Sequence, residues 1–175
     1  SGSSLNNIYI LDDYMEITGS LEDLAHGESI FSARFMGKRA YLVTFKQIDP
    51  LFVIDLSDPE NPEVLGELKI PGYSNYLHPY DENTIIGLGQ DTQGEIEEGL
   101  GPEGSNTMAA IPAGIKLALF DVSDPKNPQE ISKFITGGRG SESDALWDHR
   151  AFLFDREKNL LVIPVSVRET SPQVG

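Results

Sequence analysis

Short runs of apolar residues, broken every few positions by turn-forming residues, occupy most of the chain. Residues 30–45 and 76–88 each consist of two such runs around a tight turn, and residues 146–154 and 160–165 predict a third strand pair. Runs of this length, bounded by Gly, Asp and Asn, are typical of β-hairpins. No stretch keeps a helical period, and residues 21–25 offer one turn at most. The pattern predicts an all-β fold.

Two segments align without a gap and indicate an internal repeat. Residues 53–72 are VIDLSDPENPEVLGELKIPG, and residues 119–138 are LFDVSDPKNPQEISKFITGG. Both contain Asp-x-Ser-Asp-Pro-x-Asn-Pro, end in glycine, and carry apolar residues at matching positions. A weaker copy at residues 8–21 aligns Gly19 with Gly66 after a shorter turn.

The spacing of the copies predicts the architecture. Asp12 and Asp55 are 43 residues apart, and Asp55 and Asp121 are 66 apart. The second interval contains a polar insertion of 24 residues, 90–113, without which it shrinks to 42. A repeat of about 40–45 residues built of short strands has the size of a four-stranded β-propeller blade. The sequence therefore predicts a β-propeller, with about three blades' worth of chain.

The expected organisation follows from these boundaries. It comprises a tag or linker (1–7), the last strands of one blade (8–28), a full blade (29–72), a full blade with an acidic insertion (73–138), and the first strands of a further blade (139–175). Because a closed propeller needs about four to eight blades, we expect this chain to form part of a larger ring. Unpaired strand edges and an uncovered apolar face at each end favour self-association or a protein partner.

The Ser-Asp-Pro-x-Asn-Pro motif at residues 57–62 has two interpretations. Its oxygen-rich side chains suggest a calcium loop, but the spacing and terminal Glu of such loops are absent. Alternatively, the motif is a turn in which Ser57 or Asp58 bonds the backbone ahead, Pro59 presets φ and Pro62 ends strand pairing. The turn accounts for each residue and is the favoured interpretation.

Charge and cysteine content exclude several function classes. Asp and Glu number 28 against 13 Lys and Arg, which gives a formal net charge of −15, and Cys is absent. Such a surface repels nucleic acid and anionic lipid, and the chain cannot form disulfides or thiolate metal sites. No apolar run is long enough for a membrane span, so no membrane insertion is expected.

Few residues carry candidate chemistry. A serine hydrolase would need a Gly-x-Ser-x-Gly turn, and a zinc site would need closely spaced histidines; neither is present. Arg34, His78, Asp148 and His149 remain as candidates for the channel or rim of the ring. For Asp148 and His149, a structural hydrogen-bonded pair is favoured over a functional rim site or catalysis. His26, beside a glycine, is expected to be exposed.

The acidic insertion is the best functional candidate in the sequence. Asp91, Glu95, Glu97 and Glu98 lie among glycines, and carboxylates on such a loop suit Ca²⁺. The alternative is a solvated loop kept soluble by its charge. Calcium is the one cofactor that the sequence suggests.

The strand pairs and both copies of the turn motif, spanning about residues 8–167, resemble a prokaryotic, mostly secreted β-propeller domain family distantly related to WD40 repeats. The resemblance implies an extracellular or cell-surface location and a protein larger than this chain, and it transfers no catalytic residue. Together these features predict a non-catalytic scaffold for protein or ligand interaction. The alternative is that the complete ring is an enzyme or ligand binder with its site at the central channel.

Overall fold

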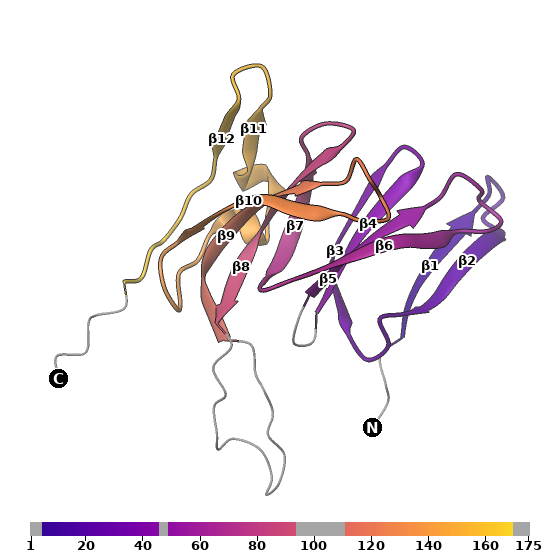
Figure 1. Cartoon of the computed structure of the whole chain (residues 1–175), viewed down its shortest axis with the longest axis horizontal. Coiled ribbons are helices and arrows are strands. Elements are labelled where there is room, and N and C mark those ends of the chain that lie inside the picture. The colour runs from indigo at the N-terminus through magenta and orange to yellow at the C-terminus, as the bar shows by residue number, and fades with distance from the viewer. Residues whose placement is uncertain (1–4, 46–48, 94–110, 170–175) are drawn as a thin grey trace, which may run out of the picture.

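The computed structural model describes residues 5–45, 49–93 and 111–169. Two four-stranded antiparallel sheets lie between two two-stranded ones (Figure 1). The first sheet pairs β1 (Asn6–Leu11) with β2 (Ile17–Leu24). The second contains β3 (Ser29–Met36), β4 (Arg39–Phe45), β5 (Asp49–Asp55) and β6 (Glu63–Ile70). The third contains β7 (Tyr73–Pro79), β8 (Thr84–Gln93), β9 (Ile111–Asp121) and β10 (Gln129–Thr136). The fourth pairs β11 (Leu153–Asp155) with β12 (Leu160–Val162).

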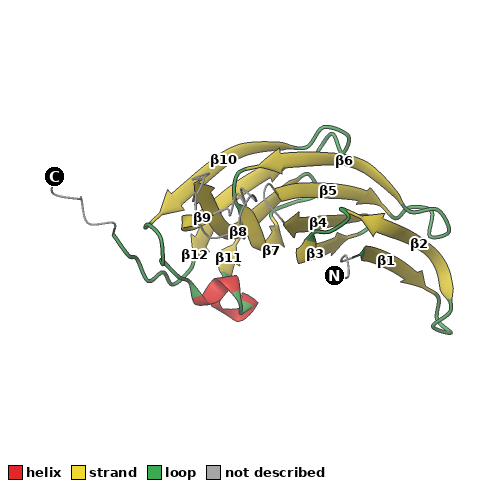
Figure 2. Cartoon of the chain, turned by 90° about the horizontal axis from the view of Figure 1, so that it is seen from below, coloured by secondary structure: helices red, strands yellow, loops and turns green. Residues whose placement is uncertain are grey.

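The sheets stand side by side as the blades of an open arc (Figure 2). Within each four-stranded sheet, spatial order follows chain order, as it does in a propeller blade. The inner side of the arc carries β3, β7 and β11, and the outer side carries β2, β6 and β10. The predicted all-β propeller fold and partial ring are confirmed. We call the four sheets blades 1 to 4 in chain order.

The hydrophobic core lies between blades and forms one cluster at each junction. Successive residues of a strand face opposite sides of its sheet, so β5 contributes to two clusters. Phe52 and Ile54 pack toward blade 1, while Leu51 and Val53 pack toward blade 3. All four side chains are buried. Each blade is therefore stabilised chiefly by its neighbours.

The Ser-Asp-Pro-x-Asn-Pro motif forms the turn between the third and fourth strands of a blade. Asp55 Oδ1 accepts a hydrogen bond from the Ser57 backbone N–H at 2.8 Å, and Asp58 Oδ1 accepts one from the Glu60 N–H at 3.1 Å. The second copy repeats both bonds at equivalent residues. These bonds within each copy match the turn interpretation.

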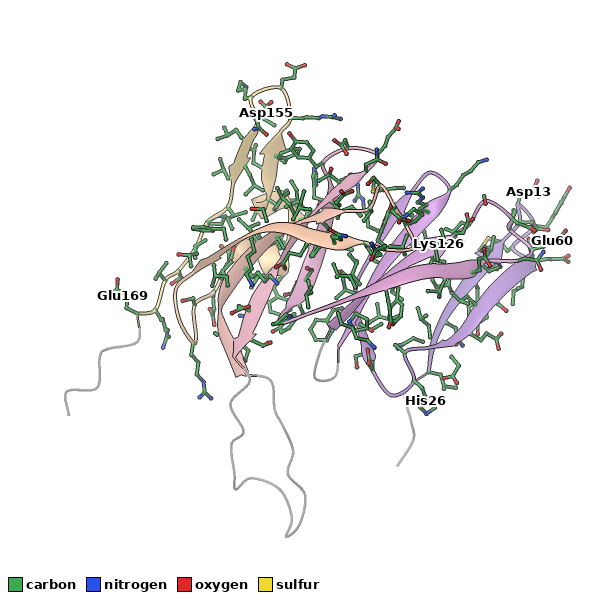
Figure 3. The ribbon with its side chains drawn as sticks, in the orientation of Figure 1. Asp13, His26, Glu60, Lys126, Asp155 and Glu169 are labelled. Carbon is green, nitrogen blue, oxygen red and sulfur yellow. The ribbon has the colours of Figure 1, made fainter. Side chains whose placement is uncertain are left out.

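Each such turn rests against the outer strand of the preceding blade, at a glycine. A Cβ on Gly19 of β2 would collide with the Pro59 carbonyl oxygen, and a Cβ on Gly66 of β6 would lie 2.5 Å from that of Pro125. Lys126 accordingly lies beside β6 in Figure 3. The glycines permit an approach of backbone to backbone that any side chain would prevent.

The structure departs from the sequence predictions at two places. The prediction of a single strand over residues 146–154 is wrong. Two 3₁₀ turns, η1 (Asp144–Leu146) and η2 (His149–Ala151), precede the short strand β11. Ser143 and Asp148 each accept a backbone N–H two residues ahead, and these bonds compete with strand pairing. The described ends of the insertion, by contrast, pair with each other, because the β8–β9 ladder continues to Gln93 and Ile111.

Candidate functional site

Arg34 and His78 occupy the same position of consecutive blades, on the inner strands β3 and β7. Arg34 pairs with Tyr41 and His78 with Ile86. These partners pair in turn with Val53 and Leu119, the first residues of the two aligned segments. Two of the residues singled out in the sequence, Arg34 and His78, thus share one position of the repeat at the inner edge of the ring.

His78 lies in an aromatic cluster that joins blades 3 and 4. Its Nδ1 is 3.0 Å from the Tyr76 hydroxyl, and its ring centroid lies 5.0 Å from that of Phe152 and 5.3 Å from that of Phe154. Burial, followed by the charge of Arg34, lowers the pKa of His78 below its ordinary 6.5. The imidazole is therefore neutral near pH 7, as its apolar surroundings require.

Asp148 and His149 do not form the expected pair. The Asp148 carboxylate binds the Arg150 guanidinium through both oxygens, with Oδ1 2.9 Å from Nε and Oδ2 2.7 Å from Nη2, and its Oδ1 accepts the Arg150 backbone N–H at 3.0 Å. These hydrogen bonds lower the pKa of Asp148 to about 2. The His149 ring instead stacks on Tyr76, with centroids 6.4 Å apart. Asp148 thus stabilises the turn at η2, and both of its carboxylate oxygens bind Arg150.

The inner-edge residues therefore favour packing over chemistry. Arg34 is near enough to influence His78, and His149 joins the same aromatic cluster through Tyr76, so the fold brings these three candidates to one region. A general base needs a partner that orients it, commonly a carboxylate, whereas His78 contacts aromatic rings and a phenol in the described part of the chain. The exposed His26 lies away from this region, with its Nδ1 2.7 Å from Asp23 Oδ1.

The calcium prediction concerns residues that the structure covers only in part. Asp91 lies on β8, opposite Gly114, whereas Glu95, Glu97 and Glu98 lie outside the described residues. Within the described ranges, no three His, Asp or Glu side chains are grouped to hold a metal ion. Calcium binding by the insertion stays a prediction.

Comparison with known proteins adds a decisive observation to this geometry. The sequence matches the family described as "Beta propeller domain" over residues 1–174. The chain belongs to this family. The propeller is also 44% identical over 159 residues to an uncharacterized protein of Methanocaldococcus jannaschii, and 41% identical over 159 residues to one of Archaeoglobus fulgidus.

Each alignment covers 91% of the propeller chain and 22% of the relative, so the chain spans about a fifth of the length of these relatives. No solved structure matches it. In the part of the propeller that the structure describes, no helix has the length and apolar character of a membrane span.

Sequence reasoning missed two features of the propeller. Lys116 on β9 is 4% exposed, with its Nζ 2.6 Å from Glu130 Oε2 and 2.9 Å from the Pro71 carbonyl oxygen. Tyr41 is fully buried, and its hydroxyl has no hydrogen-bond partner among the described residues. The buried Lys116 could have been found from the sequence, because it is a lysine inside the apolar run 115–120. The unpaired Tyr41 hydroxyl could not, because a tyrosine suits any half-buried strand.

Proposed function

We propose that this chain is a non-catalytic arc of a propeller scaffold, and that a strand–turn–strand hairpin from a further blade completes its open blade 4. One comparison carries the proposal. Leu68 on β6 and Phe134 on β10 occupy the same repeat position. Leu68 packs against the buried cluster of the blade 2–blade 3 junction, which includes Ala118 and Phe120 of β9, whereas Phe134 is 60% exposed. Within the described residues, blade 4 has two strands and no third strand to cover Phe134.

At the opposite end of the arc, blade 1 has an apolar face that no preceding blade covers in the described residues. Tyr9 and Leu11 on β1 correspond to Phe52 and Ile54, which are buried against the preceding blade. Tyr9 is 50% exposed and Leu11 45% exposed. Blade 1 therefore contributes third and fourth strands with an uncovered apolar face, while blade 4 contributes first and second strands with an open edge at β12.

The β1–β2 hairpin is the type of segment that blade 4 needs. The turn after Asp12 is shorter than the Asp-Pro turns that contact Gly19 and Gly66, so it leaves more room for a side chain on the neighbouring outer strand. On β10, the position of Gly66 is occupied by Ser132, which is exposed and has a side chain that needs this room. Two copies joined in this way would hold six blades' worth of strands, within the range of closed propellers.

The test appends a copy of residues 5–28 to the C-terminus through a flexible linker. Burial of Phe134 by the added hairpin should raise the free energy of unfolding by about 1.5–3 kcal/mol, measured by urea denaturation. The matched control carries Tyr9→Ser and Leu11→Ser in the appended copy only. Equal stability of the fusion, its control and the parent chain would refute the proposal.

Light scattering on the parent chain tests whether a second copy of the chain supplies the hairpin that completes blade 4. A dimer that Phe134→Ser dissociates, while Trp147→Ser leaves it intact, supports a ring of two copies. Trp147 is a suitable control because it is 78% exposed and lies outside the strands. A monomer that the fusion nevertheless stabilises would assign the hairpin to a longer polypeptide, as the length of the relatives suggests.

We also propose an extracellular or cell-surface location, which rests on the family resemblance and accords with the acidic surface. Fractionation of cells that express the natural protein tests it. Recovery in the cytosolic fraction alone would refute it.

A further inference from the structure

A cavity of about 680 Å³ opens between the short turns of blades 2 and 3. Its walls come from the β3–β4 turn and the β7–β8 turn, and Arg156 reaches it from the β11–β12 turn. These three turns project from the same rim of the arc (Figure 1). The volume lies within the range of sites that bind small molecules.

Tyr41 is among the residues that line this cavity, and it carries a buried hydroxyl group. The side chain is fully buried, and its hydroxyl makes no hydrogen bond within the described ranges. Its cross-strand neighbour Arg34 has a buried Nε in the same condition. Buried donors and acceptors almost always have partners, so the unpaired Tyr41 hydroxyl indicates a missing one; Arg34 itself does not line the cavity.

The charged groups of the wall favour an anionic partner. Arg39 donates one hydrogen bond, from Nη1 to the Val122 carbonyl oxygen at 3.1 Å, which leaves the rest of its guanidinium fork for other acceptors. The Lys38 ammonium is exposed. Hydrogen bonds from Ser57 are the larger cause of the lowered pKa of the Asp55 carboxyl group, and both Arg39 and Lys38 are near enough to lower it further. Lys38 and Arg39 thus line one wall of the cavity, while its third cation, Arg156, lies 3.8 Å from the Asp81 carboxylate.

Two acids lie on the opposite wall, and they do not cancel this preference. Asp81 accepts the Asn83 N–H at 2.9 Å and lies 3.8 Å from Arg156, so its carboxylate is already engaged. Glu82 is exposed to solvent. The Arg39 guanidinium and the Tyr41 hydroxyl therefore remain as the donors that the lining offers to an oxyanion.

We propose that this cavity binds a small ligand through an oxyanion group, a carboxylate or a phosphate, with the Arg39 guanidinium and the Tyr41 hydroxyl as its contacts. Guanidinium groups match the geometry of both oxyanions, and a buried phenol adds a short donor. The proposal concerns blades 2 and 3 and is independent of how blade 4 is completed.

The test titrates the 175-residue chain with citrate, with inorganic phosphate and with uncharged glycerol at constant ionic strength, followed by amide NMR. The expected result is saturable shifts of residues 36–41 and 79–83 with at least one anion and none with glycerol. Tyr41→Phe should weaken the binding roughly tenfold or more, since it removes a hydrogen bond to a charged group. Tyr14→Phe, at an 81% exposed tyrosine, is the matched control.

A second pair of variants separates a site from general charge attraction. Lys38→Gln should weaken binding, while Lys126→Gln, at an exposed lysine on another turn, should not. Tyr41→Phe is expected to fold, because it deletes only a hydroxyl that has no hydrogen-bond partner among the described residues. Absence of saturable binding for both anions, or equal affinity in Tyr41→Phe and the parent, would overturn the proposal. Equal weakening by the two lysine variants would also overturn it.

Discussion

Gly66 on the outer strand of blade 2 lies directly beneath the Pro125 carbonyl of the blade 3 turn. A Cβ at this glycine would approach that oxygen to 2.5 Å and the Lys126 carbonyl oxygen to 2.8 Å. Gly19 has the same relation to Pro59 one blade earlier. The junction between blades thus includes a repeated contact between a turn and a bare strand backbone.

Gly66→Ala is expected to destabilise the chain. The two carbonyls belong to a backbone turn held by hydrogen bonds at Asp121 and Asp124, so the turn cannot move aside without cost. Overpacking of this kind costs about 1–3 kcal/mol, which urea denaturation can measure. Ser132→Ala, at the matching position of blade 3, should be near neutral because it is exposed. Equal stability of Gly66→Ala and the parent would show that the turn is free to shift.

Lys116→Met should be strongly destabilising. It leaves the Glu130 carboxylate, which is 16% exposed, without its 2.6 Å partner. Removal of one member of a buried ion pair costs about 3–5 kcal/mol. The double variant Lys116→Met, Glu130→Leu should recover much of the loss, since both charges are then gone.

Lys133→Met is the control for the ion pair. Lys133 also approaches Glu130, at 3.7 Å, but it is half exposed, so its removal should cost under about 1 kcal/mol. If Lys116→Met and Lys133→Met lower the unfolding free energy equally, the buried pair has no special role.

His78 should give the chain a pH-dependent stability. Its pKa is lowered in the folded state, so the unfolded chain binds more protons as pH falls below about 6.5. The contribution of His78 is therefore complete above its unfolded pKa and declines as pH drops toward its folded pKa. Arg34→Gln should raise the folded pKa only in part, because burial is the larger cause.

An NMR titration of the His78 imidazole measures this shift. Arg150→Gln is the matched control, since Arg150 is paired with Asp148 and is not among the causes of the His78 shift. An unchanged His78 pKa in Arg34→Gln would contradict the assigned electrostatic cause.

The repeat predicted the fold well because each blade needs the same apolar positions to meet its neighbours. Leu56 and Val122, for example, align in sequence and both join the clusters between blades. Residues 144–151 escaped prediction because local side-chain hydrogen bonds at Ser143 and Asp148 override an apolar pattern that suits a strand.

The candidate site was predicted less well, for a different reason. The sequence identified the polar residues of the inner edge, and Arg34 and His78 do share a repeat position. Which partner each would take depends on the neighbouring blade: Asp148 bonds Arg150 rather than His149 because η2 turns the chain locally. The unpaired Tyr41 hydroxyl depends on packing between blades 2 and 3, which no spacing along one strand reveals.

The clusters between blades also govern how the molecule comes apart. Because each junction joins only two neighbours, an open arc can unravel from either end while its middle persists. Amide exchange should then be fastest at β1 and β12 and slowest around Val53 and Ile85, which lie in the central cluster. A closed ring has no such end, so its lifetime is set by the simultaneous breaking of two junctions rather than the fraying of one.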